Sequence, residues 1–130
     1  MDIVIDTSAL ISVIAGEPER DEILRITSGQ TLIGPGSIPW EIGNAFSAMF
    51  KQHRLSIDQA ARGIDIFHLI PIRYIEIDFH RVLMISEQAG LYAYDAYFLD
   101  CALRCHAPLL TLDRKLKNAA SQYNVSLLEV

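Results

Sequence analysis

The stretch that decides the fold is Ile3-Val4-Ile5-Asp6-Thr7-Ser8-Ala9-Leu10. Its first three residues form a short apolar run of β-branched side chains, which is typical of a buried strand. The polar triplet that follows suits the N-terminus of a helix, and the apolar residues from 9 to 14 fit that helix. The start of the chain therefore predicts a strand that passes directly into a helix.

The rest of the chain continues this alternation. Apolar runs and helix-capping residues predict strands at 31–33, 72–77, 109–112 and 125–128, and helices at about 19–26, 39–53, 56–69, 79–89, 94–107 and 115–122. Short, wholly apolar strands separated by helices indicate a parallel sheet covered on both faces. We expect an α/β fold, namely a three-layer α/β/α sandwich with a central parallel sheet.

Composition narrows the class of protein further. The 130 residues are 51% hydrophobic and 21% charged, which excludes a disordered chain and predicts one domain spanning residues 1–130. The formal net charge of −5 argues against a polybasic coat for nucleic acid. The cysteines, Cys101 and Cys105, are too few for a disulfide framework, and we expect both to be buried free thiols.

The sequence also carries expectations about location. The N-terminal segment has no basic region and meets a charge at Asp2, so it does not have the pattern of a signal peptide. No apolar run approaches the roughly 18 residues needed to span a membrane. We therefore expect a cytoplasmic protein without a membrane partner.

Four carboxylates interrupt apolar segments at places where the predicted fold brings them together. Asp6 and Asp113 follow strands, and Glu41 and Asp95 lie in the first turns of helices. In parallel α/β sheets, ligands bind beyond the carboxyl ends of the strands. Any one of these acids could simply cap a helix or a turn. Together, with no Lys or Arg beside Asp6, Glu41 or Asp95, they favour a divalent metal site.

The chemistry of such a cluster is specific. Mg²⁺ and Mn²⁺ prefer hard oxygen ligands and retain several waters. Ions held in this way bind phosphate oxygens and lower the pKa of a water molecule. Without the metal the carboxylates repel one another, so at least one of them should have a raised pKa.

Four segments, in order, resemble the PIN domain, and in particular the VapC-type ribonuclease toxins of type II toxin–antitoxin pairs. The matching segments lie at residues 3–10, 41–45, 94–99 and 110–116, so they span nearly the whole chain. This resemblance implies a PIN-like fold and metal-dependent hydrolysis of RNA phosphodiester bonds. It also implies a cognate antitoxin, whose C-terminal segment lies across the active site, and a homodimer.

The same resemblance implies roles for individual residues. Asp6, Glu41, Asp95 and Asp113 would be the catalytic acids that bind Mg²⁺ or Mn²⁺. Asp6 and Asp95 would contact the metal directly. Glu41 would bind the metal through a water or orient the attacking water, and Asp113 would act through a water or support a second ion. The polar side chains expected to support these acids are Thr7, Ser8, Asn44 and Thr111. The basic residues after Asp113 either contact RNA phosphate or only solubilise their helix: Arg114, Lys115 and Lys117.

Other residues receive structural interpretations. Asp100 lies about 140° around the helix from Asp95, so we expect it to be solvated or paired with Arg104 rather than to bind metal. Trp40 is expected in the core or in an interface. Packing is also expected for at least two of the tyrosines that could otherwise stack on bases, Tyr92, Tyr94 and Tyr97.

Two alternatives to a toxin remain. The first is a PIN-like nuclease of RNA processing outside a toxin pair. The second is a PIN-like module that binds without catalysis, although the intact set of acids argues against this.

Overall fold

The computed structural model describes residues 1–130 and contains four strands and seven helices. The strands are β1 (Asp2–Ile5), β2 (Thr31–Pro35), β3 (Arg73–Ile75) and β4 (Leu109–Leu110). The helices are α1 (Thr7–Ala15), α2 (Arg20–Thr27), α3 (Ile38–Lys51), α4 (Ile57–Leu69), α5 (Phe79–Ala89), α6 (Ala93–Cys105) and α7 (Arg114–Gln122). None of these helices is long and apolar enough to cross a membrane.

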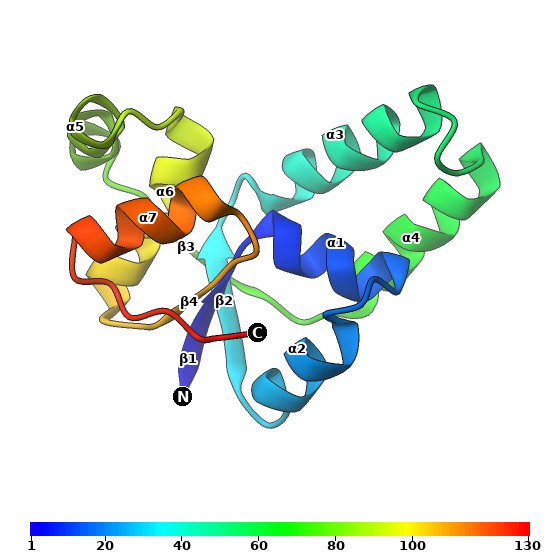
Figure 1. Ribbon diagram of the computed structural model, residues 1–130, viewed down its shortest axis with the longest axis horizontal. Coiled ribbons are helices and arrows are strands. Elements are labelled where there is room, and N and C mark those ends of the chain that lie inside the picture. Colours follow the sequence, from blue (N-terminus) through cyan, green and yellow to red (C-terminus); the bar gives the residue numbers. More distant parts are fainter.

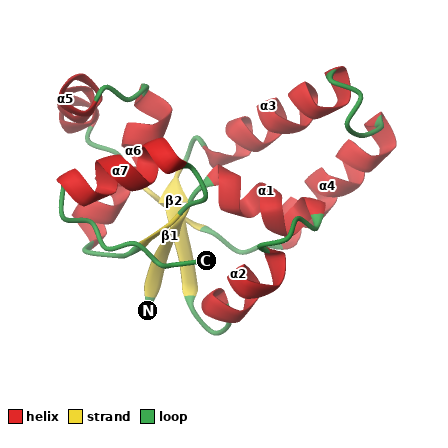
Figure 2. Cartoon of the chain, viewed as in Figure 1, coloured by secondary structure: helices red, strands yellow, loops and turns green.

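All four strands pair in parallel, in the order β3-β2-β1-β4. Helices α5, α6 and α7 lie on one side of this sheet and α1 to α4 on the other (Figure 1). Figure 2 shows the strands as a thin central layer between the two groups of helices. The predicted three-layer α/β/α sandwich with a parallel sheet is therefore confirmed.

The apolar runs form the buried layer that their composition predicts. Ile3, Val4 and Ile5 of β1 are almost completely buried, and β2 ends in three buried residues. Strand β1 pairs with β2 on one side and with β4 on the other. Its carboxyl end, followed at once by Asp6, consequently lies at the centre of the sheet edge.

Several predicted helix boundaries are confirmed by their caps. Ser56 and Gln59 form the expected capping box of α4, and Asp78 caps α5. Gly90 ends α5 in the left-handed conformation, with φ of 66°. A glycine adopts this conformation without the steric cost of a Cβ.

Four strand predictions need correction. The strands predicted at 72–77 and 109–112 are shorter, spanning Arg73–Ile75 and Leu109–Leu110. The strand predicted at 125–128 is reduced to a single bridge between Leu109 and Leu127, because β4 is too short to support a longer ladder. Strand β2 continues to Pro35 instead of ending before Gly34. Pro35 lacks a backbone N–H, yet it aligns with Ile75 of β3.

Candidate active site

Asp6 is held firmly at the end of β1. Its Oδ1 accepts hydrogen bonds from Ser8 Oγ at 2.7 Å and from the Ala9 amide at 3.0 Å, so it caps α1. Its Oδ2 accepts a hydrogen bond from Thr111 Oγ1 at 2.5 Å. The residue is only 5% exposed. Helix capping and a role in a site are therefore compatible for this carboxylate.

Ser8 and Thr111 connect the ends of β1 and β4. Ser8 Oγ accepts a hydrogen bond from the Leu112 amide at 3.0 Å. Thr111 Oγ1 accepts one from the Asp113 amide, also at 3.0 Å. These two hydroxyls thus fix the segment that leads to Asp113 against the carboxyl end of β1.

Glu41 lies in the first turn of α3, and hydroxyl groups from two elements orient it. Thr7 Oγ1 donates to Oε1 at 3.2 Å, and Ser37 Oγ donates to Oε2 at 2.6 Å. The sequence prediction included Thr7 but missed Ser37. Its spacing could have revealed it, because residues four apart at the start of a helix share a face.

The remaining two acids keep free oxygen atoms. Asp113 caps α7, and its Oδ1 accepts hydrogen bonds from the amides of Lys115 at 2.8 Å and Leu116 at 3.3 Å. Its Oδ2 has no hydrogen-bond partner. Asp95, in the first turn of α6, accepts no hydrogen bond at all; burial and nearby charges alone set its pKa.

Burial and mutual repulsion raise the pKa of three of the acids. For Asp6, burial raises the pKa to about 6 against the opposing hydrogen bonds, and the charge of Asp113 adds to the rise. The pKa of Glu41 is raised mainly by burial, with smaller contributions from Asp6 and Asp95. The expectation of a raised pKa is confirmed, although burial outweighs repulsion as its cause.

Asp95 completes this electrostatic pattern. Burial and then the charge of Asp113 raise its pKa, while Lys115 opposes the rise. The repulsions link Asp6 to Asp113, Asp113 to Asp95, Asp95 to Glu41 and Glu41 back to Asp6. The structure thus brings the four predicted acids, from four parts of the chain, close enough at the sheet edge for their charges to affect one another.

The donor set of this place suits a hard divalent cation. It consists of carboxylate oxygens, some of them without partners, and the only cation that affects the acids' pKa values is Lys115. As the side chains lie, no three Asp, Glu, His or Cys residues form a preassembled set of metal ligands. An ion would therefore have to draw these carboxylates together, offsetting their repulsion.

Comparison with known proteins decides the family. The PIN domain family matches residues 3–122, which is most of the chain. The chain belongs to the PIN domain family. The fold expected from the resemblance is therefore confirmed. A separate comparison with curated protein sequences found no match.

Solved structures agree with this fold. PAE2754 from Pyrobaculum aerophilum is 22% identical, with a TM-score of 0.71 over 92% of this chain and 79% of that one. A chain in the structure of VapBC2 from Rickettsia felis is 17% identical, with a TM-score of 0.69 over 98% of both chains. That structure contains a DNA fragment from the VapBC2 promoter. A toxin–antitoxin complex from Klebsiella pneumoniae is 19% identical, with a TM-score of 0.53 over 85% and 86%.

The other predicted polar residues of this PIN domain lie at the rim. Asn44 is exposed and, with Thr7 and Glu41, lines a cavity of about 250 Å³. Arg114 and Lys115 are exposed at the start of α7, and Lys117 is half-buried one turn further. Of these three basic side chains, only Lys115 affects the pKa of an acid in the cluster, that of Asp95.

The aromatic residues near the acids lie closer to the surface than the sequence analysis expected. Trp40 is 76% exposed, so the core position is wrong. Tyr92 and Tyr94 are also exposed, but Tyr94 and Tyr97 pack against each other, so two of the three tyrosines make packing contacts. Tyr97 is half-buried, and its ring contacts those of Tyr94 and Phe79 edge-on.

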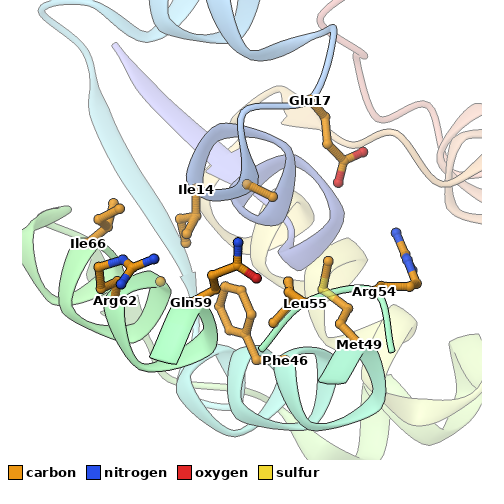
Figure 3. A pocket seen from close by; sticks show the side chains of 11 residues that line it. Ile14, Glu17, Phe46, Met49, Arg54, Leu55, Gln59, Arg62 and Ile66 are labelled. Atoms are coloured by element: carbon orange, nitrogen blue, oxygen red, sulfur yellow. The ribbon is translucent and has the colours of Figure 1, made fainter. Parts of the chain in front are cut away.

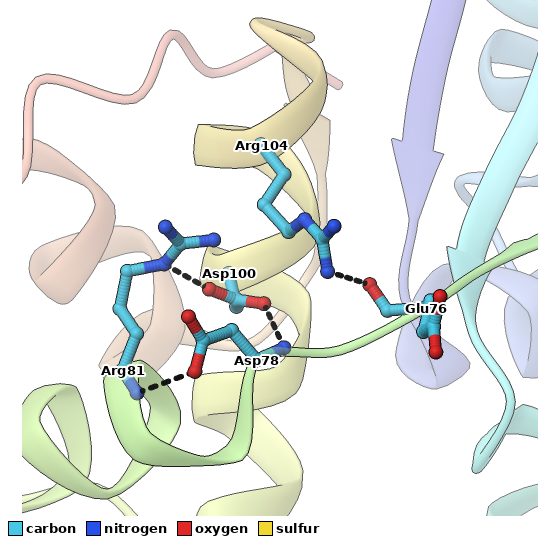
Figure 4. Close-up of polar contacts among 5 residues, drawn as sticks. All are labelled: Glu76, Asp78, Arg81, Asp100 and Arg104. Atoms are coloured by element: carbon cyan, nitrogen blue, oxygen red, sulfur yellow. Dashed lines mark hydrogen bonds and ion pairs between the residues drawn. The ribbon is translucent and has the colours of Figure 1, made fainter.

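The interpretation of Asp100 is also wrong. This residue is fully buried, and its carboxylate pairs with Nε of Arg81 and accepts a hydrogen bond from the Asp78 amide at 3.1 Å (Figure 4). Arg104 instead donates to the Glu76 carbonyl at 2.6 Å. Asp100 therefore ties α6 to the start of α5, a contact between segments that helix periodicity does not reveal.

The cysteines are free, as expected, but only Cys101 is buried, and Cys105 is half-buried at the end of α6. Burial raises the pKa of Cys101 to about 12, which makes its thiolate inaccessible at neutral pH. Neither cysteine belongs to the acidic site.

A second cavity lies between α1, α3 and α4. It has a volume of about 520 Å³ and contains none of the four acids (Figure 3). Phe46 and Met49 of α3 form part of its apolar wall, Gln59 of α4 lies beside Phe46, and Arg62 lies further along α4. A Cβ at Gly63 would come within 2.6 Å of the Phe46 ring, so this glycine permits the close approach of α4 and α3.

Proposed function

We propose that this chain is a ribonuclease that hydrolyses RNA phosphodiester bonds with Mg²⁺ or Mn²⁺ and acts as the toxin of a toxin–antitoxin pair. The observation that carries the proposal is the set of four mutually repelling carboxylates at the carboxyl edge of the sheet. Folding places these charges together against a cost in free energy, which is typical of a functional site rather than of a structural one.

Asp6 and Asp95 would hold the metal directly, with Glu41 and Asp113 acting through water or on a second ion. The unpartnered oxygens of Asp95 and Asp113 support this assignment, because they have lone pairs to offer. When bound, the metal supplies charge for a phosphate oxygen and lowers the pKa of a water molecule.

The chain itself supplies the orientation. Ser8 and Thr111 fix both oxygens of Asp6, and Ser37 and Thr7 fix those of Glu41. In this arrangement Glu41 would orient the attacking water. The exposed start of α7 would contact the RNA backbone through Arg114, Lys115 and Lys117, and the position of Lys115 near Asp95 supports this role.

We further propose an antitoxin as the protein partner. The support is the fold shared with a toxin–antitoxin complex and with VapBC2, together with the cavity between α1, α3 and α4. This cavity combines apolar walls with two cations, Arg54 and Arg62, against one acid, Glu17, which suits an amphipathic segment that carries acidic residues. RNA as substrate and an antitoxin as partner imply action in the cytoplasm.

We also propose that residues 1–130 form one PIN domain that acts as a homodimer. Leu83 and Met84 of α5 are 64% and 60% exposed, and they offer an apolar surface for a second copy. Large exposed apolar surfaces on a small domain often mark such contacts.

The experiment that tests the function is induction of the protein in bacteria beside its Asp95→Asn variant, followed by sequencing of new RNA ends. We expect growth arrest and cleavage at a few sites with the wild-type protein only. Equal RNA profiles, with both proteins soluble and folded, would contradict nuclease activity and favour a binding module. Cleavage that no co-expressed antitoxin from the neighbouring gene suppresses would favour RNA processing.

A further inference from the structure

An aromatic cavity lies beside the acidic site and has no part in the function proposed so far. Its volume is about 540 Å³, within the usual range for ligand sites. Four aromatic side chains line it: Trp40 from α3, Phe79 from α5, and Tyr94 and Tyr97 from α6. Aromatic groups from three helices thus converge on one depression.

These rings are arranged as a fixed wall. The Tyr97 ring contacts both Phe79 and Tyr94. Its centroid is 5.9 Å from that of Phe79 and 5.8 Å from that of Tyr94. The interplanar angles of 84° and 87° are those of favourable edge-to-face contacts. Phe79 and Tyr94 nevertheless remain 62% and 55% exposed, so each keeps surface available for another planar group.

The same residues connect this cavity to the acids. Trp40 and Tyr94 also line the smaller cavity that contains Thr7, Glu41 and Asn44. Along the chain, Trp40 directly precedes Glu41, and Tyr94 directly precedes Asp95. A strand whose phosphate lies at the acids would therefore bring its next base to the aromatic wall.

Charge identifies the part of a nucleotide that fits. No Lys or Arg lines the aromatic cavity, and its one charged residue is Glu76. A phosphate would be repelled there, whereas the amino group of a base can donate a hydrogen bond to a carboxylate. Arg104 reaches Glu76 only through the backbone carbonyl, at 2.6 Å, and does not itself line the cavity.

We propose that Trp40, Tyr94, Phe79 and Tyr97 form a subsite that stacks an unpaired nucleobase next to the cleaved phosphate. The proposal rests on the ribonuclease function above and adds its selectivity. A base in this cavity must leave a duplex, so the subsite selects single-stranded or looped RNA. Glu76 adds a preference for bases that carry an amino group.

The test uses Trp40 as its own probe, because it is the only tryptophan of the chain. An RNA of about twelve nucleotides, single-stranded or annealed to its complement, is added to the Asp95→Asn protein in Mg²⁺ while tryptophan fluorescence is recorded. We expect quenching by the single strand and much weaker quenching by the duplex. Affinities of the variants are measured by the anisotropy of labelled RNA.

Tyr94→Leu should weaken binding of the single strand about five- to one-hundred-fold, since a stacking aromatic is removed. Trp40→Phe should retain most of the affinity, and Trp40→Leu should lose it. Tyr92→Leu is the matched control, because Tyr92 is an exposed neighbouring tyrosine that lines neither cavity. We expect its affinity to stay unchanged.

The outcomes separate this proposal from the function on which it rests. Quenching with these variant effects supports the subsite even if the wild-type protein proves unable to cleave RNA. Cleavage by the wild-type protein without quenching, or with full activity in Trp40→Leu, overturns the subsite and leaves the ribonuclease intact. A halved molecular mass of Trp40→Leu in light scattering also overturns it, and would make the aromatic surface a subunit interface.

Discussion

At the scale of single residues, Asp6 shows how strongly the fold constrains its acidic site. Three hydrogen bonds hold the carboxylate, and burial still raises its pKa to about 6. The hydrogen bonds recover only part of the free energy that the charge loses on leaving water. The site is therefore a place where the metal-free protein gives up stability.

This leads to a prediction for Asp6→Asn. The folded pKa of Asp6 lies above its unfolded value, so its contribution to stability is present below about pH 4 and is lost as the pH rises through about 6. At neutral pH, and without metal, Asp6→Asn should raise the free energy of unfolding by about 1 to 3 kcal/mol. Urea unfolding in EDTA at several pH values measures this.

The pH dependence of the stability difference tests this prediction. The gain from Asp6→Asn should shrink as the pH falls toward 4, because the wild-type carboxyl is then protonated as well. A variant that is less stable than wild type at neutral pH would mean that the hydrogen bonds from Thr111 and Ser8 outweigh burial.

Most of the acidic site could be predicted from the sequence because each acid lies at the end of a predicted strand or the start of a predicted helix. Asp6 and Asp113 follow apolar strands and Glu41 and Asp95 open helices, so their meeting at one sheet edge follows from the parallel topology. Ser37 was missed because its hydroxyl bonds a side chain instead of capping its own helix.

At the scale of elements, helix α6 has two roles along its length. Its first turn presents Asp95 to the acidic site, and its middle anchors the segment before α5 through Asp100. The pairing of Asp100 with Arg81 joins residues 19 positions apart. Helix periodicity describes contacts within an element, so it could not predict this partner.

We expect Asp100→Ala to lower the free energy of unfolding by about 2 to 4 kcal/mol. The substitution leaves the Asp78 amide and the half-exposed Arg81 without their acceptor. Thermal or urea unfolding measures the change. Arg104→Ala is a suitable control, because this exposed side chain makes one bond to a carbonyl and should cost less than about 1 kcal/mol. Equal effects of the two substitutions would contradict the structural role of Asp100.

Short strands explain the boundary errors. Strand β4 has two residues, and the segment predicted as a final strand makes only one bridge to it. The extended conformation of this segment was predicted correctly, but a ladder needs a partner strand of sufficient length.

The exposure of Trp40 has a different cause, since hydrophobicity predicts burial only on average.

At the scale of the whole molecule, negative charge is concentrated at the proposed metal site. The net charge is −5, and four of the acids lie in one cluster. Bound divalent ions would neutralise most of this excess, so a negative chain can act on a negative substrate. Binding of metal to the folded state alone also raises apparent stability.

One prediction concerns folding and metal together. We expect residues 1–130 to unfold in a single cooperative transition, as one domain of this size usually does. Added Mn²⁺ should raise the melting temperature of the wild-type protein and have little effect on Asp95→Asn. Differential scanning calorimetry measures both. An equal rise in the two proteins would place the bound ion away from the acidic site.

Another prediction concerns assembly. Leu83→Glu places a charge on the exposed apolar surface of α5, so it should shift a homodimer to monomer without unfolding. Light scattering at several concentrations measures the molecular mass, and circular dichroism checks the fold. An unchanged dimer would exclude Leu83 from its interface. A monomeric wild-type protein would contradict the dimer itself.

The measurement that tests the central claim most directly is cleavage of RNA by the purified protein. Wild type, Asp95→Asn and the control Tyr92→Leu are incubated with cellular RNA in Mn²⁺ or in EDTA, and the product ends are mapped. We predict defined cleavage by wild type and Tyr92→Leu in Mn²⁺ and cleavage by Asp95→Asn that is at least about a hundredfold slower. In EDTA we predict no cleavage by any of the three proteins. Full cleavage by Asp95→Asn, or equal cleavage in EDTA, would contradict a metal-dependent site built on these acids.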